Sequence, residues 1–334
     1  MLKYVLKRIL LIIPTVLGVL LIIFTINYFT PGDPVQMALG TDYTQEQYEA
    51  TKAEMGLDKP FLVRYVNYVV DFFAHGSLGT SYDTKRPVMD MILQRLPITL
   101  RLGLSACAVT IVVGILVGIV SAVKQYSVID YLTTTFAVIF SAAPAFWVAL
   151  MAIIVFCLNL KWFDAGGIYS WRSYILPVIC LAVSPISLVA RMTRTSMLDV
   201  IRSDYIRTAR AKGVAERSVI FNHALKNALI PILTVVGMQL TTVLGGSFII
   251  ESVFSIPGIG MLMLTAINNR DYPTTQGVVL LISIAVCIIN LLVDLAYAAV
   301  DPRIKSQYSS GSKKNQKAAV EVQTGQTDGK EGGA

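Results

Sequence analysis

Residues 102–123, LGLSACAVTIVVGILVGIVSAV, contain no charged side chain and no proline. An α-helix needs about 20 consecutive apolar residues to cross the hydrocarbon core of a bilayer, so this stretch predicts a membrane-spanning helix. The rest of the chain has the same character, because 54% of its 334 residues are hydrophobic, only 15% are charged, and the mean hydropathy is +0.63. Soluble domains carry about 25% charged residues, so the composition favours an integral membrane protein.

Six apolar stretches of this kind lie between groups of charged residues, and we predict an all-α polytopic membrane protein with six transmembrane helices. The first stretch follows basic residues, as in a signal peptide. It is longer than a signal peptide's apolar region and has no A-x-A cleavage site, so we expect it to stay as an anchor. The predicted spans are 9–32, 102–123, 131–160, 173–190, 227–250 and 272–300.

Basic residues are distributed unequally between the two alternating sets of loops. One set holds 18 Lys and Arg residues, in loops 1–8, 124–130, 191–226 and 301–334. The other set holds 10, in segments 33–101, 161–172 and 251–271. Seven of these 10 lie in the long segment 33–101, and basic residues in long loops have little influence on the orientation of a membrane protein. We therefore predict that both termini and the loop 191–226 are cytoplasmic, and we attribute the net charge of +7 to this topology and expect no nucleic-acid partner.

The predicted organisation divides the chain into four parts. Residues 1–32 form the cytoplasmic N-terminus and the first span, and residues 33–98 form a small extracytoplasmic helical cap. Within the cap, residues 45–55 and 61–73 have amphipathic helical patterns. Residues 99–300 form the transmembrane core with the cytoplasmic loop 191–226, and the polar tail 301–334 is expected to be disordered beyond residue 306.

Ionisable side chains are scarce inside the predicted spans, where Asp294 is the one clear example. We interpret it as an interfacial aspartate near the cytoplasmic end of its helix. Transporters driven by protons or ions usually carry acidic, His or Arg side chains within their spans. The chain also lacks the GxxxxGK[ST] loop that binds nucleotide phosphates, so energy for active transport must come from another subunit. The four cysteines and two histidines are widely separated, and we expect neither a metal site nor catalytic residues.

Residues 196–213, SMLDVIRSDYIRTARAKG, predict a short amphipathic helix in the cytoplasmic loop. Ser196 and Asp199 have the spacing of a helix N-terminus, and Gly213 can provide a left-handed stop. Leu198, Ile201, Tyr205 and Thr208 fall at helical spacing, and the other face carries Arg202, Arg207 and Arg210. Such a helix can dock an apolar ridge into a partner's groove; the alternative is a basic helix that lies on anionic lipid.

Residues 205–213 (YIRTARAKG) and 222–231 (NHALKNALIP) resemble the EAA loop of ABC importer permeases, in the form found in the dipeptide/oligopeptide branch. The pattern departs from the general one where Arg207 and Thr208 replace Glu and Ala, and where Lys226 replaces proline. The resemblance covers about residues 1–305. It includes the motifs 30–34 (TPGDP), 56–60 (GLDKP), 76–81 (GSLGTS), 96–100 (LPITL), 251–260 (ESVFSIPGIG), 270–273 (RDYP) and 301–303 (DPR).

This resemblance implies a type I ABC importer permease fold in a bacterial or archaeal cell membrane. It implies a second homologous permease, two cytoplasmic ATPases that bind ATP and Mg, and an extracytoplasmic binding protein that delivers di- or oligopeptides. The chain itself would hold no cofactor. The residues implied in ATPase coupling are Tyr205, Arg207, Thr208, Ala209, Arg210, Gly213 and Glu216.

The family resemblance also places an external constriction at the outer end of the fifth span. Gly245 and Gly246 weaken a helix there, and Glu251 and Phe254 follow. We take these four residues as a candidate outer gate. The alternative is close helix packing, with Glu251 as a solvated cap.

Three further functions stay open. The same architecture could carry nickel, glutathione or a sugar. A stand-alone secondary transporter or channel would need intramembrane charges, which are scarce in this chain. A membrane enzyme would need a nucleophile, an acid–base pair or a metal cluster, and the sequence offers none.

Overall fold

The structure, a computed structural model, describes residues 2–40 and 42–300. Within these residues every regular element is a helix, apart from one isolated bridge between Thr80 and Pro87, so the all-α prediction is confirmed. The predicted disordered tail lies outside the described residues. The helices are α1 (Leu2–Phe29), α2 (Pro34–Leu39), α3 (Gln45–Glu54), α4 (Phe61–His75), α5 (Val88–Val123), α6 (Val128–Ala142), α7 (Ala145–Ala152), the π-helix η1 (Ile153–Asn159), the 3-10 helix η2 (Trp171–Tyr174), α8 (Ile175–Ile201), α9 (Asp204–Ala211), α10 (Glu216–Ser218), the π-helix η3 (Val219–Leu225), α11 (Lys226–Val253), α12 (Ile259–Asn268) and α13 (Tyr272–Val300).

Five helical segments, centred on α1, α5, α8, α11 and α13, are long and apolar enough to cross a membrane. A sixth crossing results when α6 and the following α7–η1 segment are counted as one broken span. The predicted number of spans is confirmed on this count. The predicted bounds of the last span, 272–300, are those of α13, and the predicted cap helices are present as α3 and α4.

The third predicted span is not one continuous helix. Its two halves, α6 and α7–η1, differ in direction by 106°. Ala143 between them has φ −76° and ψ 128°, the extended conformation that the ring of a following proline favours. Pro144 also lacks the N–H that would continue the helical hydrogen bonds. The predicted span over residues 131–160 is therefore one span only when these two bent helices are counted together.

Several other helix ends differ from the predicted spans. Helix α5 begins at Val88 rather than at residue 102, and α8 continues to Ile201 rather than ending at residue 190. The first span ends at Phe29, three residues earlier than predicted. The predicted limits followed the charged residues, which mark where a helix leaves the apolar phase and not where its backbone hydrogen bonds stop.

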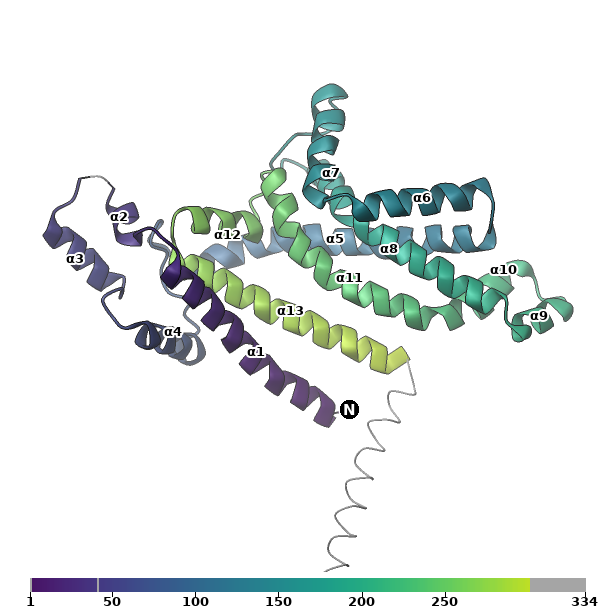
Figure 1. The fold of residues 1–334 in the computed structure, drawn as a ribbon, viewed down its shortest axis with the longest axis horizontal. Helices are drawn as coiled ribbons and strands as arrows, with labels where there is room; N and C mark the ends of the chain where they lie inside the picture. Colours follow the sequence, from purple (N-terminus) through teal and green to yellow (C-terminus); the bar gives the residue numbers. More distant parts are fainter. Residues whose placement is uncertain (1, 41, 301–334) are drawn as a thin grey trace, which may run out of the picture.

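Helices α5 and α8 pack closely along their length and form the centre of the bundle (Figure 1). Two glycines of α5 make this possible. A Cβ atom on Gly118 would lie 2.5 Å from the Cβ of Thr193, and one on Gly114 would lie 2.8 Å from the Cβ of Val189. The GxxxG spacing at these positions therefore serves helix packing.

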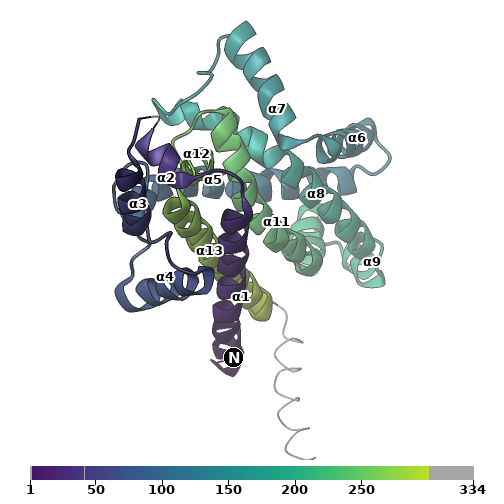
Figure 2. The ribbon, with the colours of Figure 1, turned by 60° about the vertical axis from the view of Figure 1, so that its left-hand side comes forward.

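The N-terminus, the end of α13 and α9 lie toward one end of the bundle, and α2 and α3 lie toward the other (Figure 1). We call these the α9 end and the α3 end. Helices α1 and α13 lie side by side, as Figures 1 and 2 both show. Arg8 on α1 forms an ion pair with Asp294 on α13, with 2.9 Å between Nη2 and Oδ2, so the intramembrane aspartate singled out from the sequence has a basic partner.

Candidate functional site

The segment predicted as a coupling helix forms the separate short helix α9 at the α9 end of the bundle. The Thr208 hydroxyl donates a hydrogen bond of 3.0 Å to the Asp204 carbonyl one turn earlier. Gly213 takes a φ of +79°, and its N–H donates to the Arg210 carbonyl at 2.9 Å. A left-handed residue ends a helix in this way, so the predicted stop at Gly213 is confirmed.

The predicted start of this helix is wrong. Ser196 and Asp199 lie inside α8, which runs on to Ile201, and they do not begin a helix. No glycine or proline interrupts residues 186–212, so the sequence has no local signal that would stop α8 earlier. Helix α9 begins only at Asp204, after a two-residue break at Arg202 and Ser203.

One apolar side chain attaches α9 to the rest of the protein. Ile206 has 0% of its surface exposed and belongs to a cluster with Met197 of α8, Val219 and Ala224 of η3, and Ile119 of α5. The predicted apolar ridge is not one surface, because its members divide between the core and the solvent: Leu198 is buried on α8, Ile201 is half-buried, and Tyr205 and Thr208 are exposed on α9. The inward residue of α9 is therefore Ile206.

The outward face of α9 is polar and basic. Tyr205 is 49% exposed, the Arg207 side chain is 78% exposed, and Thr208 is exposed beside them. Arg210 forms a two-pronged ion pair with Glu216 of α10, with distances of 2.6 and 3.1 Å from its guanidinium nitrogens to the carboxylate oxygens. This hydrogen bonding raises the pKa of Arg210 and fixes the turn that follows α9. The predicted coupling residues are thus all exposed, apart from the half-buried Ala209.

A shallow pocket lies beside this face, on the short helix α10 and the π-helix η3. Its lining includes the exposed aromatic ring of Phe221 and the side chains of Arg217 and Asn222. No motif includes Phe221 or Arg217, although Asn222 begins the motif at 222–231. A local signal was present, because Phe221 is a large aromatic residue that follows Ile220 and directly precedes the polar residues Asn222 and His223. The exposed face of α9 and this pocket together form what we call the coupling surface.

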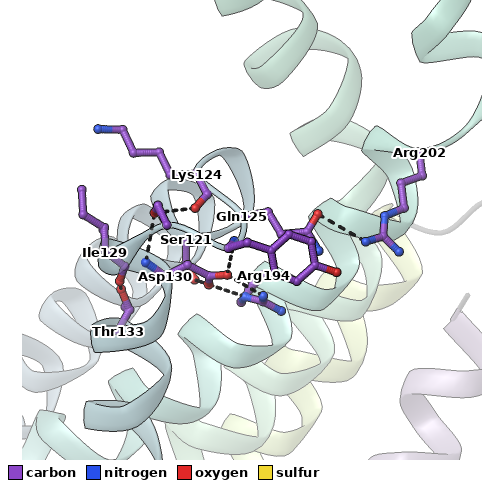
Figure 3. Close-up of polar contacts among 10 residues, drawn as sticks. Ser121, Lys124, Gln125, Ile129, Asp130, Thr133, Arg194 and Arg202 are labelled. Atoms are coloured by element: carbon purple, nitrogen blue, oxygen red, sulfur yellow. Dashed lines mark hydrogen bonds and ion pairs between the residues drawn. The ribbon is translucent and has the colours of Figure 1, made fainter.

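A buried ion pair lies behind the coupling surface, between α6 and α8 (Figure 3). The guanidinium of Arg194 on α8 donates two hydrogen bonds to the carboxylate of Asp130 on α6, at 2.6 and 2.7 Å. The Ser121 hydroxyl of α5 donates to the same carboxylate at 2.5 Å, and the backbone N–H of Tyr126 donates to it at 3.0 Å. Asp130 therefore joins α5, α6, the turn between them, and α8.

The turn between α5 and α6 depends on these bonds. Tyr126 has a φ of +62°, an unfavourable conformation for a residue with a Cβ atom, and its N–H is held by Asp130. Arg202, which follows α8, donates a further hydrogen bond of 3.2 Å to the side-chain oxygen of Gln125 in the same turn. Sequence reasoning missed the pair, because Asp130 and Arg194 are 64 residues apart and each looked like the boundary of an apolar run.

The four residues of the candidate gate lie near the α3 end and differ in their surroundings. Phe254 is 1% exposed, and its carbonyl accepts a hydrogen bond of 2.9 Å from the N–H of Gly167. Helix α11 passes through Gly245 and Gly246 without a break. A Cβ atom on Gly245 would meet nothing within 4 Å, so this glycine is not required for close packing within the chain.

Glu251 is completely buried, so the alternative of a solvated cap is wrong. One of its carboxylate oxygens accepts a hydrogen bond of 2.7 Å from the N–H of Gly260, and a Cβ atom on Gly258 would lie 2.4 Å from the carboxylate carbon. The Thr99 hydroxyl of α5 accepts a hydrogen bond of 2.8 Å from the N–H of Ile259. The motifs at 96–100 and 251–260, far apart in the sequence, therefore meet at one buried polar site.

A second pair of motifs meets in the same part of the protein. Asp271 is 2% exposed and accepts hydrogen bonds from the Ser81 hydroxyl at 2.6 Å, the Tyr82 N–H at 2.9 Å and the Thr274 hydroxyl at 2.6 Å. The motifs at 76–81 and 270–273 are therefore in contact. This carboxylate fixes the segment around Ser81 and Tyr82 to the start of α13.

The motif at 30–34 completes this arrangement. Asp33 accepts a hydrogen bond of 2.8 Å from the N–H of Val35 at the start of α2, and one of 2.7 Å from the Tyr48 hydroxyl of α3. The hydrogen bond to this carboxylate raises the pKa of Tyr48 to about 12. Gly32 has a φ of +122°, and a Cβ atom there would lie 3.1 Å from the Arg270 side chain. The motifs at 30–34, 76–81 and 270–273 thus hold the α3 end together, while the motif at 301–303 lies outside the described residues.

No group of three or more His, Cys, Asp or Glu side chains that could hold a metal ion occurs in residues 2–40 and 42–300. The polar clusters at the two ends of the bundle are instead closed by arginine, hydroxyl and backbone N–H donors. Their chemistry is that of structural joints between helices.

Comparison with known proteins identifies the family to which this chain belongs. A family model described as "Binding-protein-dependent transport system inner membrane component" matches residues 114–306, and a model for the N-terminal part of such components matches residues 1–103. The chain belongs to this family. It is a multi-pass, non-catalytic inner-membrane permease subunit, and the resemblance to the peptide branch of ABC importer permeases is confirmed.

Named relatives match this permease over nearly their whole length. It is 42% identical to the dipeptide transport system permease protein DppB of Alkalihalophilus pseudofirmus, over 91% of this chain and 100% of the relative. It is 40% identical to the glutathione transport system permease protein GsiC of Pectobacterium atrosepticum, over 91% and 99%. Among solved structures, the inward-facing MetNI methionine ABC transporter has a chain that matches with a TM-score of 0.54 at 21% identity, covering 64% of this permease and 97% of that chain. This likeness shows that the permease has the fold of an ABC importer membrane subunit.

Proposed function

We propose that the permease forms, with a second homologous permease, the path by which an ATP-driven importer carries di- or oligopeptides across the membrane. An extracytoplasmic binding protein delivers the peptide, and two cytoplasmic ATPases bind ATP and Mg and supply the energy. The observation that carries this proposal is the coupling surface, a basic, exposed helix attached by one buried isoleucine at the end of a bundle whose spans contain few charges. Peptide cargo is supported by the name of the dipeptide relative.

The coupling surface is the proposed contact with the ATPases. The Arg207 side chain is 78% exposed, with its guanidinium 3.8 Å from the Asp204 carboxylate, while Arg210 is fixed by Glu216 at 2.6 Å. The exposed ring of Phe221 supplies an apolar contact beside them. Aromatic and arginine side chains are the residues that most often dominate protein interfaces. A basic helix lying on anionic lipid is the alternative, and it would not need the adjacent pocket.

Movement at this surface has a direct route into the membrane helices. Ile206 of α9 belongs to the same buried cluster as Met197 of α8 and Ile119 of α5. Behind it, the Asp130–Arg194 pair connects α6 and the α5–α6 turn to α8. We infer that closure of the ATPases displaces α9 together with the ends of these three helices.

The orientation follows from the same proposal. The α9 end, with the N-terminus, faces the cytoplasm, and the α3 end faces outward in a bacterial or archaeal cell membrane. The excess of Lys and Arg in the loops of the α9 end supports this orientation. The predicted cytoplasmic C-terminus lies outside the described residues.

We keep the candidate gate at the α3 end as a proposal in which the four residues have different tasks. Gly245 is exposed on α11 and can face the path or the second permease. Phe254 and Glu251 are buried and hold the segment that follows α11. Phe254→Ala should raise ATPase activity in the absence of the binding protein, because the closed outer end loses its packing. Unchanged basal ATPase activity in an assembled complex would assign Phe254 to ordinary packing.

Glutathione is a second candidate cargo, favoured by the relative named as a glutathione permease. Nickel and sugars have no such support among these relatives. A stand-alone transporter or channel is a different class of function, and it would carry substrate without ATP.

The test is uptake by the complete complex in liposomes, with the second permease, the ATPases and the binding protein expressed together. We expect ATP-dependent uptake of labelled di- or tripeptides, with glutathione uptake measured in parallel. Flux through the chain alone without ATP, or uptake that is indifferent to ATP, would contradict the proposal. A preference for glutathione over peptides would mean that the cargo is glutathione, and the proposed ATP-driven mechanism would stay the same.

A further inference from the structure

Helix α4 presents three chemically different faces, although the sequence predicts it as part of an extracytoplasmic cap. One face packs on the first span, where the rings of Tyr65 and Tyr68 lie edge-on to Phe24 with centroid distances of 5.5 and 5.4 Å. A second face is polar and turns toward a pocket between α4, α3 and the start of α13. Its members are Arg64, Asn67 and Asp71.

The third face of α4 is apolar and exposed. Its side chains repeat every three or four residues and form one stripe, which no other part of residues 2–40 and 42–300 covers. The stripe comprises Leu62, Val66, Val70 and Phe73, which are 66%, 52%, 52% and 60% exposed. Four large apolar side chains in a row on one helix need an apolar partner.

The depth of α4 along α1 identifies that partner. The Tyr65 hydroxyl donates a hydrogen bond of 3.0 Å to the carbonyl of Leu17. At a rise of about 1.5 Å per residue, Leu17 lies about 18 Å before Phe29, the last residue of α1, and Phe24 lies about 8 Å before it. The hydrocarbon core is about 30 Å thick in all, so both contacts are to the membrane-embedded part of α1 and not to its outer end.

Figure 2 agrees with this depth, because α4 lies beside α1 at a level part-way along the length of α1. Helix α1 itself exposes apolar side chains over the same region, with Ile22 60% and Ile26 53% exposed. Lipid that surrounds α1 at the level of Phe24 therefore also reaches α4, which is in contact with that residue.

We propose that α4 is an interfacial helix embedded in the membrane leaflet at the α3 end, with the stripe Leu62, Val66, Val70 and Phe73 in contact with phospholipid acyl chains. Its polar face then borders the pocket above the hydrocarbon, and its aromatic face holds it against α1. An amphipathic helix in this position buries its apolar side several ångströms below the headgroups. This proposal does not depend on the cargo or on the coupling role of α9.

The experiment places an environment-sensitive fluorophore on single cysteines in the assembled complex in phosphatidylcholine vesicles. The test positions are Val66 and Val70, which are both exposed, so that labelling does not disturb a packed core. The matched controls are Asn67, the next residue on the pocket-lining face, and Ala50 on α3. Protein without an introduced cysteine is a further control, because it shows how much of the labelling falls on the native cysteines Cys107, Cys157, Cys180 and Cys287.

We expect lipid with a nitroxide on carbon 5 of its acyl chain to quench the fluorophore at Val66 and Val70 several-fold more than at the controls. Aqueous iodide should give the opposite order. Equal quenching at Val66 and Asn67, or strong quenching of Val66 and Val70 by iodide, would overturn the proposal. The other possible occupant of the stripe is the second permease. A photoreactive benzophenone placed at Val66 tests for it, because a crosslink to the second permease instead of to lipid would also overturn the proposal.

Discussion

Replacement of Asp130 by alanine should weaken the α9 end of the permease more than any other single loss of an ion pair in the described residues. The Asp130 side chain is 4% exposed, and its carboxylate accepts four hydrogen bonds from Ser121, Tyr126 and Arg194. Alanine would leave the Arg194 guanidinium without its partner and the left-handed Tyr126 without its anchor. Loss of one partner of a buried pair costs about 3–5 kcal/mol, and we expect about 2–4 kcal/mol because Arg194 is partly exposed.

The ion pair between Arg8 and Asp294 provides a matched control, because it also joins two helices, α1 and α13. Its side chains are 45% and 23% exposed. Asp294→Ala should therefore cost about 1 kcal/mol or less. The measurement is the thermal unfolding midpoint of the purified complex, with the ratio of peptide imported to ATP hydrolysed as the second readout. We expect Asp130→Ala to lower both quantities, and Asp294→Ala to change neither appreciably.

The double variant Asp130→Ala, Arg194→Leu measures the interaction energy between the two residues. It removes the unpaired charge as well as the hydrogen bonds. Its loss in free energy of unfolding should therefore be smaller than the sum of the losses in the two single variants, by about 1–3 kcal/mol. Additive losses, or an Asp130→Ala variant as stable as Asp294→Ala, would refute the reasoning that this carboxylate holds the three elements together.

Three further predictions address α9, the centre of the bundle and the orientation. Gly213→Val should lower the free energy of unfolding by about 1–2 kcal/mol, because Gly213 has a left-handed φ, and it should lower the stimulation of ATPase activity by the binding protein. Gly213→Asn should be tolerated. Equal stimulation in both variants would show that Gly213 does not belong to the coupling surface. Gly118→Ala should lower the thermal unfolding midpoint, because overpacking typically costs about 1–3 kcal/mol. Gly18→Ala on α1 is the control: a Cβ atom at Gly18 would meet nothing within 4 Å, so this variant should leave the midpoint unchanged. In intact cells with a permeable outer barrier, an impermeant maleimide should label a cysteine at Ala50 and not at Ala211, and labelling of Ala211 would reverse the topology.

Features that depend on neighbouring residues could be predicted from the sequence. The stop at Gly213, the helix α13 and the two cap helices all have local signals, and the structure contains them. The break at Pro144 also had a local signal, but the apolar run on both sides favoured one span.

Features that depend on distant residues could not be predicted. Asp130 and Arg194 each stand at the edge of an apolar run, and nothing in the local sequence shows that their helices meet. Glu251 looked like a solvent-facing cap because it follows a span, yet the chain folds back so that Gly260 donates to it. The motifs were recognised one by one from the family resemblance, but the contact between Ser81 and Asp271 required the three-dimensional arrangement.

The placement of these joints determines how a movement of α9 can spread. Helix α5 is tied near its start, where Thr99 accepts from Ile259, and at its end, where Ser121 donates to Asp130. Between these points Gly118 brings it into close contact with α8. We therefore expect helices α5 and α8 to move together along the span. In the proposed coupling, these two helices would carry a displacement of α9 by the ATPases to the α3 end, while the break at Pro144 would allow α7 to follow a different path.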